Sequence, residues 1–185
     1  IFVSKLDSSG TIIWFKQFGS SLYDYSRSVA IDYYDRSIII TGYSSGSLPN
    51  NNSSGKVDIF VSKLDTSGTI LWVKQFGSNL NDESNSVTID SFDRSILICG
   101  YTSGSLPNNI SSGGDDIFIA KLDTLGTIIW IKQIGSSLND ACKSVTIDYY
   151  DKSIIITGYS SGSLPENVNS GGEDIFVSKL NTSGT

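Results

Sequence analysis

The sequence repeats itself every 58 residues, with no insertion or deletion between copies. The segment IFVSKLD opens the chain and returns, with small changes, at a constant spacing, its four occurrences beginning at Ile1, Ile59, Ile117 and Ile175. A fixed period of this length is typical of arrays in which each unit buries its apolar face against its neighbours. The 185 residues therefore divide into three copies and the start of a fourth, at 1–58, 59–116, 117–174 and 175–185.

Each copy contains four short segments rich in Val, Ile, Phe, Tyr, Trp and Thr, the residues that fit a pleated sheet. In the second copy these segments lie at 59–64, 69–76, 86–90 and 95–101. The Asp-Thr-Ser-Gly segment at 65–68 predicts a tight hairpin turn, because glycine adopts a positive φ without steric cost. No segment shows a helical period, so we predict an all-β fold.

Some of these segments are apolar at consecutive positions. Residues 37–41 read SIIIT and residues 11–15 read TIIWF, without the alternation of a strand that has one wet face. A strand of this kind needs cover on both sides. A sheet placed between two similar sheets supplies that cover, which favours the blades of a propeller over a two-layer sandwich.

The motifs of the repeat resemble those of a known family. The segments SVTID (86–90), SILICGY (95–101), DIFIAKLD (116–123) and GTIIW (126–130) are similar to the repeat of the SBBP β-propeller family, and the likeness recurs in every copy. The resemblance implies tandem four-stranded antiparallel blades, either a β-propeller or a propeller-like open array. It also implies that each blade begins at an inner strand and runs outward, with no single activity shared by the family.

The resemblance places the structural blades out of phase with the sequence copies. The blades fall at about 26–76, 84–134 and 142–185, and residues 1–18 form the outer half of a preceding blade. Propellers generally have at least four blades. Three alternatives therefore stay open: the array continues, chains associate, or the blades form an open stack. Because the chain starts and stops within a repeat and has no methionine, we expect both ends to lie inside a longer array.

Composition excludes several classes of function. The net charge of −6 argues against a nucleic-acid or anionic-lipid partner, since both need a positive surface. No apolar run approaches the ~20 residues of a membrane-spanning helix. Histidine is absent, which excludes Ser-His-Asp and Cys-His arrangements. The carboxylates recur identically in every copy, as structural turns do, so we predict that this segment is not an enzyme and needs no cofactor.

One acidic series precedes the inner strands and is our candidate for weak calcium sites. It consists of Asp24, Asp82 and Asp140. A second series, Asp58, Asp116 and Asp174, precedes the third strand of each predicted blade, which is the segment that opens each sequence copy. Neither series shows the alternating carboxylates and distal glutamate of an EF-hand loop. The alternative is that these side chains accept backbone N–H bonds in turns.

Aromatic residues occur in two kinds of position. Trp14, Trp72 and Trp130 lie in the predicted outer strands, where we expect them to pack between blades. A second group falls in the turn after each inner strand and is our candidate ligand or partner surface: Tyr33, Tyr34, Phe92, Tyr149 and Tyr150. Aromatic residues exposed on turns stack on sugars or contact another chain, whereas the alternative is a turn packed on the next blade.

The two cysteines are not part of the repeated pattern. Cys99 stands where other copies have Thr41 and Thr157, and Cys142 stands where they have Ser26 and Ser84. Because neither recurs, we predict two small, partly buried thiols and no disulfide framework.

These features favour a non-catalytic scaffold at the cell surface or outside the cell. Its partners would be proteins, or further copies of the chain joined through sheet edges and repeated loops. The first alternative is a carbohydrate-binding, lectin-like propeller. The second is a supporting segment of a larger enzyme whose active residues lie elsewhere.

Overall fold

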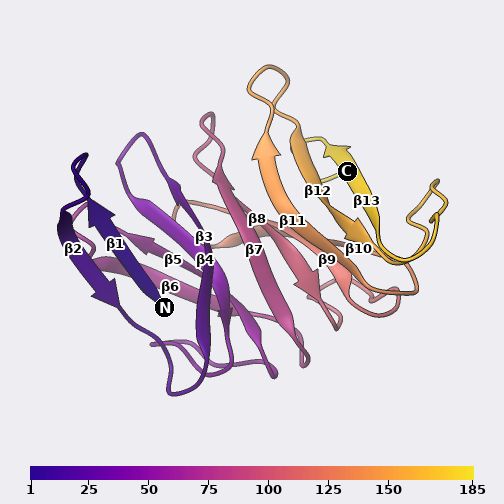
Figure 1. The fold of residues 1–185 in the computed structure, drawn as a ribbon, viewed down its shortest axis with the longest axis horizontal. Coiled ribbons are helices and arrows are strands. Elements are labelled where there is room, and N and C mark those ends of the chain that lie inside the picture. Colours follow the sequence, from indigo (N-terminus) through magenta and orange to yellow (C-terminus); the bar gives the residue numbers. More distant parts are fainter.

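A computed structural model describes all residues from 1 to 185 and consists of strands and loops without a helix, so it holds no helix able to cross a membrane (Figure 1). In chain order the strands are β1 (Phe2–Leu6), β2 (Ile12–Gln17), β3 (Asp24–Ile31), β4 (Ile38–Ser44), β5 (Asp58–Leu64), β6 (Ile70–Phe76), β7 (Asp82–Ile89), β8 (Ile96–Thr102), β9 (Asp116–Leu122), β10 (Ile128–Ile134), β11 (Asp140–Ile147), β12 (Ile154–Ser160) and β13 (Asp174–Leu180). The all-β prediction is confirmed.

The strands form four separate antiparallel sheets that follow one another along the chain. The hairpin β1–β2 comes first, followed by the sheets β3-β4-β5-β6 and β7-β8-β9-β10, and then by the three-stranded sheet β11-β12-β13. We call the last three the first, second and third blade. They stand side by side, with the two chain ends on opposite sides of the molecule (Figure 1). The sheets are not closed into a ring, since β2 pairs with β1 and not with β13.

The inner strands connect consecutive blades. β7 packs against β3 and β4, and β11 packs against β7 and β8. The backbone N–H of Val87 donates to Ser28 Oγ and that of Val145 donates to Ser86 Oγ, each at 3.2 Å. Each inner strand carries a bulge at the same place, between Ser26 and Ser28 in β3. A bulge increases the local twist of a strand, and the serine that follows it reaches the next blade.

The core lies in the junctions between blades rather than within one sheet. β5 and β9 are buried at every position. The first junction, between the first and second blades, encloses Phe118 and Ile98, and the second encloses Ile117 and Ile156. Two-sided cover explains why residues 37–41, most of which lie in β4, do not alternate, as predicted.

The same expectation is wrong for the outermost strands. Ile12, Ile13 and Phe15 of β2 are each more than half exposed, and so are Leu71 of β6 and Ile129 of β10. The blades diverge from the inner to the outer strands (Figure 1), so neighbouring outer strands cover each other only in part.

The outer tryptophans do contact the next blade, as predicted. Trp14 Nε1 donates to the carbonyl oxygen of Thr66 at 3.1 Å, and Trp72 Nε1 donates to that of Thr124 at 3.3 Å. Both acceptors lie in the Asp-x-x-Gly turn of the following blade. A Cβ on Gly68 would lie 3.0 Å from the Trp14 ring, so the turn fits the ring closely only with glycine there.

The prediction of two free thiols is wrong. Cys99 and Cys142 form a disulfide that joins β8 to β11, with Cα atoms 5.8 Å apart, inside the normal range for such bonds. Both residues are fully buried in the second junction. Thr41 and Ser84 occupy the equivalent positions of the first junction. The two cysteines are therefore a matched change on the two sides of one junction.

Candidate interaction rim

The turns after the inner strands form one rim of the molecule. They cover residues 32–36, 90–94 and 148–152, and each is closed in the same way. Asp32 Oδ1 accepts the backbone N–H of Tyr34 at 3.0 Å. The last residue, Arg36, has φ of +60°, as do its equivalents within 2°. A tight turn of this kind projects its second and third residues outward, and both are aromatic in two of the three turns.

The third residue of the first two turns, Tyr34 and Phe92, contacts a cation from the turn of the next blade. The Arg94 guanidinium lies 4.4 Å from the centre of the Tyr34 ring, and Lys152 Nζ lies 4.2 Å from that of Phe92. Arg94 also donates to Asp32 Oδ2 from Nε at 2.9 Å and from Nη2 at 2.7 Å. The rings of Tyr34 and Phe92 are therefore each contacted by a basic side chain from the turn of the next blade, whereas Tyr150 is fully exposed.

The second residue of the turn has no such cation. Tyr33 is 89% exposed and Tyr149 is 65% exposed, while Ser91 occupies this place in the second blade. A hollow of 640 Å³ opens beside them and is lined by Val29 and Ile31 of β3 and by the turn residues Tyr33, Tyr34, Phe92 and Tyr149. Three consecutive blades thus contribute to one hollow, and Tyr150 alone of the predicted aromatic residues lies outside it.

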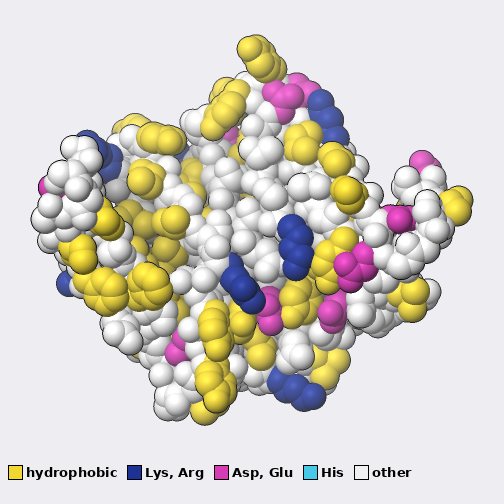
Figure 2. All heavy atoms as spheres, viewed as in Figure 1, with side chains coloured by type: hydrophobic (Ala, Val, Ile, Leu, Met, Phe, Trp, Pro, Cys, Tyr) yellow, Lys and Arg dark blue, Asp and Glu magenta, His cyan; other side chains and the backbone are white.

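Acidic and basic side chains lie together on the face shown in Figure 2, with apolar side chains on both sides of them. The turns themselves are held by repeated ion pairs. Lys121 Nζ of β9 lies 2.8 Å from Asp93 Oδ2, and Lys63 lies 3.1 Å from Asp35. Burial acts to raise the pKa of Asp93, but hydrogen bonds from Lys121 and Ser95 outweigh it and lower that pKa. The ionised carboxylate therefore fixes the turn that presents the aromatic residues.

The last residue of the turn is Arg94 in the second blade and Lys152 in the third, so each can be replaced by the other's residue type. Replacing Arg94 with Lys should lower the melting temperature, because lysine makes a point contact where arginine bonds Asp32 through two nitrogens. Lys152→Arg is the matched variant and should raise it, by offering Asp90 the same pair of bonds. Both shifts should shrink at high salt. Equal melting temperatures for all three proteins would contradict a role for this contact.

The three aspartates predicted as calcium ligands lie at the opposite end of the inner strands. Asp82 is buried and accepts hydrogen bonds from Ser78 N at 2.7 Å, from Ser78 Oγ and from Thr102 Oγ1. Asp140 repeats this pattern with Ser136 and Ser160, and Asp24 repeats it half-buried. Burial raises the pKa of Asp82 against these hydrogen bonds, and the nearby Asp58 raises it further. The structure gathers no group of three acidic side chains around one point.

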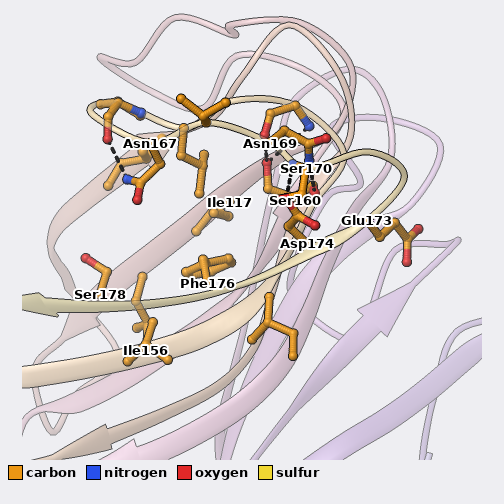
Figure 3. A pocket seen from close by; sticks show the side chains of 17 residues that line it. Ile117, Ile156, Ser160, Asn167, Asn169, Ser170, Glu173, Asp174, Phe176 and Ser178 are labelled. Atoms are coloured by element: carbon orange, nitrogen blue, oxygen red, sulfur yellow. Dashed lines mark hydrogen bonds between the residues drawn. The ribbon is translucent and has the colours of Figure 1, made fainter.

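A hollow of 800 Å³ lies along β13 and the loop before it (Figure 3). Asn167 and Phe176 line it, and the equivalent places of the other blades are filled. There, Asn51 Nδ2 donates to Val73 O at 3.1 Å, and Leu48 N donates to Gln75 Oε1 at 2.8 Å, both on β6. The hollow therefore corresponds to the place of a fourth strand and does not indicate a ligand site.

Sequence reasoning missed two groups of residues at these sites. It gave no role to Arg94 and Lys152, although all three turns carry a basic residue at this position. It also treated Asp58 and Asp82 as separate series, because spacing along the chain does not show that two strand starts meet at one junction. In both cases the signal was a constant residue type across copies.

Comparison with known proteins agrees with this arrangement of sheets. The family model described as a β-propeller repeat, SBBP, matches residues 13–49 and 71–107. These two segments are similar to the SBBP repeat. Each match runs from an outer strand through the loop to the first two strands of the next blade, so it spans a junction. The resemblance in the sequence motifs is thereby confirmed.

A relative extends the similarity beyond the two SBBP segments. An uncharacterized WD repeat-containing protein of Acanthamoeba polyphaga mimivirus is 25% identical over 193 aligned residues, which cover 86% of this chain. The chain spans 14% of that protein's length. The SBBP matches and this likeness support a repeat scaffold. Its partner is inferred from the geometry of the rim.

Proposed function

We propose that the chain is a non-catalytic scaffold that binds protein partners at the rim of turn aromatics. The observation that carries the proposal is the hollow to which the turns of three consecutive blades contribute Tyr33, Phe92 and Tyr149. Aromatic side chains at a concave mouth are typical of binding hot spots, since they bury much area at low entropic cost. The repeat family and the WD repeat-containing relative support a scaffold rather than an enzyme.

The same rim provides rigidity for binding. The turns are fixed by the Asp93–Lys121 ion pair and by the Arg94 contacts, so the exposed rings are held in place before a partner arrives. Preorganisation of this kind reduces the entropic cost of association. Because the blades repeat, a partner with several aromatic-binding segments would gain further affinity from multivalency.

An extracellular or cell-surface location is part of the proposal. The disulfide between Cys99 and Cys142 supports it, because disulfides form and persist in oxidising compartments. Self-association through sheet edges stays a prediction; the structure offers the open edges of its sheets, among them that of β13, which has no fourth strand beside it.

We expect the double variant Tyr33→Ala/Tyr149→Ala to lose binding. The probe is a phage-displayed library of random peptides selected on the full chain. Selected peptides should bind the double variant about tenfold more weakly or worse, as when hot-spot aromatics are truncated. Tyr23→Ala is the control, since Tyr23 is 72% exposed at the other end of β3 and should bind as the wild type does.

The carbohydrate alternative is decided by a glycan array run on the same proteins. Tyr33 and Tyr149 each expose a ring without a cation over it, as sugar stacking also requires. Glycan binding that Tyr149→Ala abolishes, together with no peptide selected at the rim, would replace the protein partner with a sugar. Peptides that bind the wild type and the double variant equally would contradict the rim as the site.

A further inference from the structure

Each blade junction contains a pair of buried carboxylates with no basic partner. Asp58 and Asp82 belong to the first junction, Asp116 and Asp140 to the second, and all four are fully buried. No lysine or arginine nitrogen lies within the 4.0 Å of an ion pair from any of them, since every such pair in the molecule involves other acids. Burying unpaired charge is costly. The negative charge of the two carboxylates in each junction is therefore not balanced by a basic side chain of the protein.

One carboxylate oxygen in each junction also lacks a hydrogen bond. Asp58 Oδ2 accepts the backbone N–H of Ser54 at 2.7 Å and Gln75 Nε2 at 3.2 Å, but Asp58 Oδ1 is buried without a partner. In the second junction, Asp116 Oδ1 is equally unpartnered, while Asp116 Oδ2 is bonded. Buried polar atoms are nearly always satisfied, and the same exception at both junctions indicates a missing ligand rather than a local irregularity.

In the first junction, the unpartnered oxygen and the second carboxylate flank a common point. Asp58 Oδ1 and Asp82 Oδ2 both lie near one point beside Gly77, at 2.5 and 2.6 Å from the position that a Cβ would occupy there. A side chain on Gly77 would collide with both oxygens, so glycine keeps this point free. Two strand starts, β5 and β7, thus direct oxygen atoms at a common place.

We infer that each of the two junctions binds a Ca²⁺ ion between its two carboxylates, Asp58 with Asp82 and Asp116 with Asp140. The groups around this point offer oxygen and no nitrogen or sulfur acceptor, which selects a hard cation. Two carboxylates match a double positive charge. Ca²⁺ fits better than Mg²⁺, because an irregular set of oxygens does not supply the octahedral geometry that Mg²⁺ demands.

The remaining ligands would be hydroxyl and water oxygens, of which Ser78 Oγ and Thr102 Oγ1 already contact Asp82. With only two carboxylates, affinity should resemble that of extracellular calcium modules, with a Kd of about 0.1–1 mM. The ion would hold the start of β7 to the start of β5. Its effect is therefore to fasten one blade to the next.

Asp24 provides an internal control. It makes the same hydrogen bonds as Asp82, from Ser20 N at 2.8 Å and from Ser44 Oγ, yet the position equivalent to Asp58 would precede Ile1. Asp24 thus has no second carboxylate in this chain. We assign calcium to two of the three aspartates named from the sequence, Asp82 and Asp140, each of which has a second carboxylate within residues 1–185.

The experiment is a calcium titration of the full, oxidised chain after treatment with EDTA. Calorimetry should give two Ca²⁺ per chain, and the melting temperature should rise by about 5–10 °C at ~5 mM CaCl₂. MgCl₂ at the same concentration should give a clearly smaller rise. Asp58→Asn should reduce the number of sites to one, and Asp58→Asn/Asp116→Asn should reduce it to zero, whereas Asp24→Asn should leave two.

Asparagine keeps the shape of aspartate, so these variants should stay folded, and far-ultraviolet circular dichroism checks this. Three results would overturn the proposal: no calcium-dependent change, an equal response to Mg²⁺, or two sites retained in the double variant. A double variant that is more stable than the wild type at every calcium concentration would also overturn it. That result would mean that a proton, and not a metal ion, neutralises each pair.

Discussion

Replacing Cys99 with Thr and Cys142 with Ser should lower the free energy of unfolding by about 4 kcal/mol. The disulfide closes a sequence separation of 43 residues, and the chain-entropy model assigns a loop of this size about that stabilisation. Urea unfolding in a non-reducing buffer measures the effect. The double variant is the natural comparison, because it gives the second junction the same pair that stands at the first, Thr41 and Ser84.

Reduction of the wild type provides a second route to the same state. Both sulfur atoms are buried, so a reductant should act only once the junction opens or denaturant is present. Reduced wild type should then unfold at the urea concentration of the double variant, since both lack the covalent link between β8 and β11. Thiol titration under denaturing conditions should find no free thiol before reduction and two after it. Identical unfolding of oxidised wild type and double variant would contradict a stabilising disulfide.

The loss should be confined to one junction. In repeat arrays, stability is close to a sum of unit terms and nearest-neighbour terms. Without the disulfide, the second junction resembles the first, and the third blade should separate from the other two at a lower urea concentration. A calcium ion between Asp116 and Asp140 would act on this same junction, so the double variant should depend more strongly on calcium than the wild type.

The 58-residue repeat is the feature that allows the fold to be predicted from the sequence. A constant period and four strand-like segments per copy predict the blades, and the outer tryptophans contact the next blade as expected. Strand type follows from residue type, and the order of strands follows from short connections. The exposure of Ile13 and Phe15 did not follow, because it depends on how far apart the blades lie at their outer edges.

The errors have one physical origin. The sequence shows how each residue differs from the residues at the same position of the other copies, which form one column of the repeat. Contacts in an array instead join one position to a different position of the next copy. Cys99 and Cys142 each differ from the residues at the same position of the other copies, and Thr41 and Ser84 occupy the corresponding places of the first junction. Comparing columns across neighbouring copies would have joined them. The same comparison relates Arg94 to Tyr34 and Asp82 to Asp58, which are the contacts that define the candidate sites.

Ile117→Ala should lower the free energy of unfolding by about 2–5 kcal/mol, the range for truncating a fully buried aliphatic side chain. Ile117 lies in β9, is 1% exposed and packs within the second junction. Its equivalent in β13, Ile175, occupies the same place in the repeat but is 85% exposed. Ile175→Ala should therefore change stability by no more than about 0.5 kcal/mol.

The pair separates junction packing from strand propensity. Both isoleucines lie in strands of nearly the same sequence, DIFIAKL and DIFVSKL, and both pair with a tyrosine on the neighbouring strand, Tyr101 or Tyr159. The substitution is the same in both, but β9 pairs with a strand on each side whereas β13 pairs only with β12. The difference between the two variants, measured by urea unfolding, therefore reports the cover that Ile117 receives from the neighbouring blade and from the adjoining outer strand. Equal losses would mean that the sheets are stabilised one by one, and the array would not be held together at its junctions.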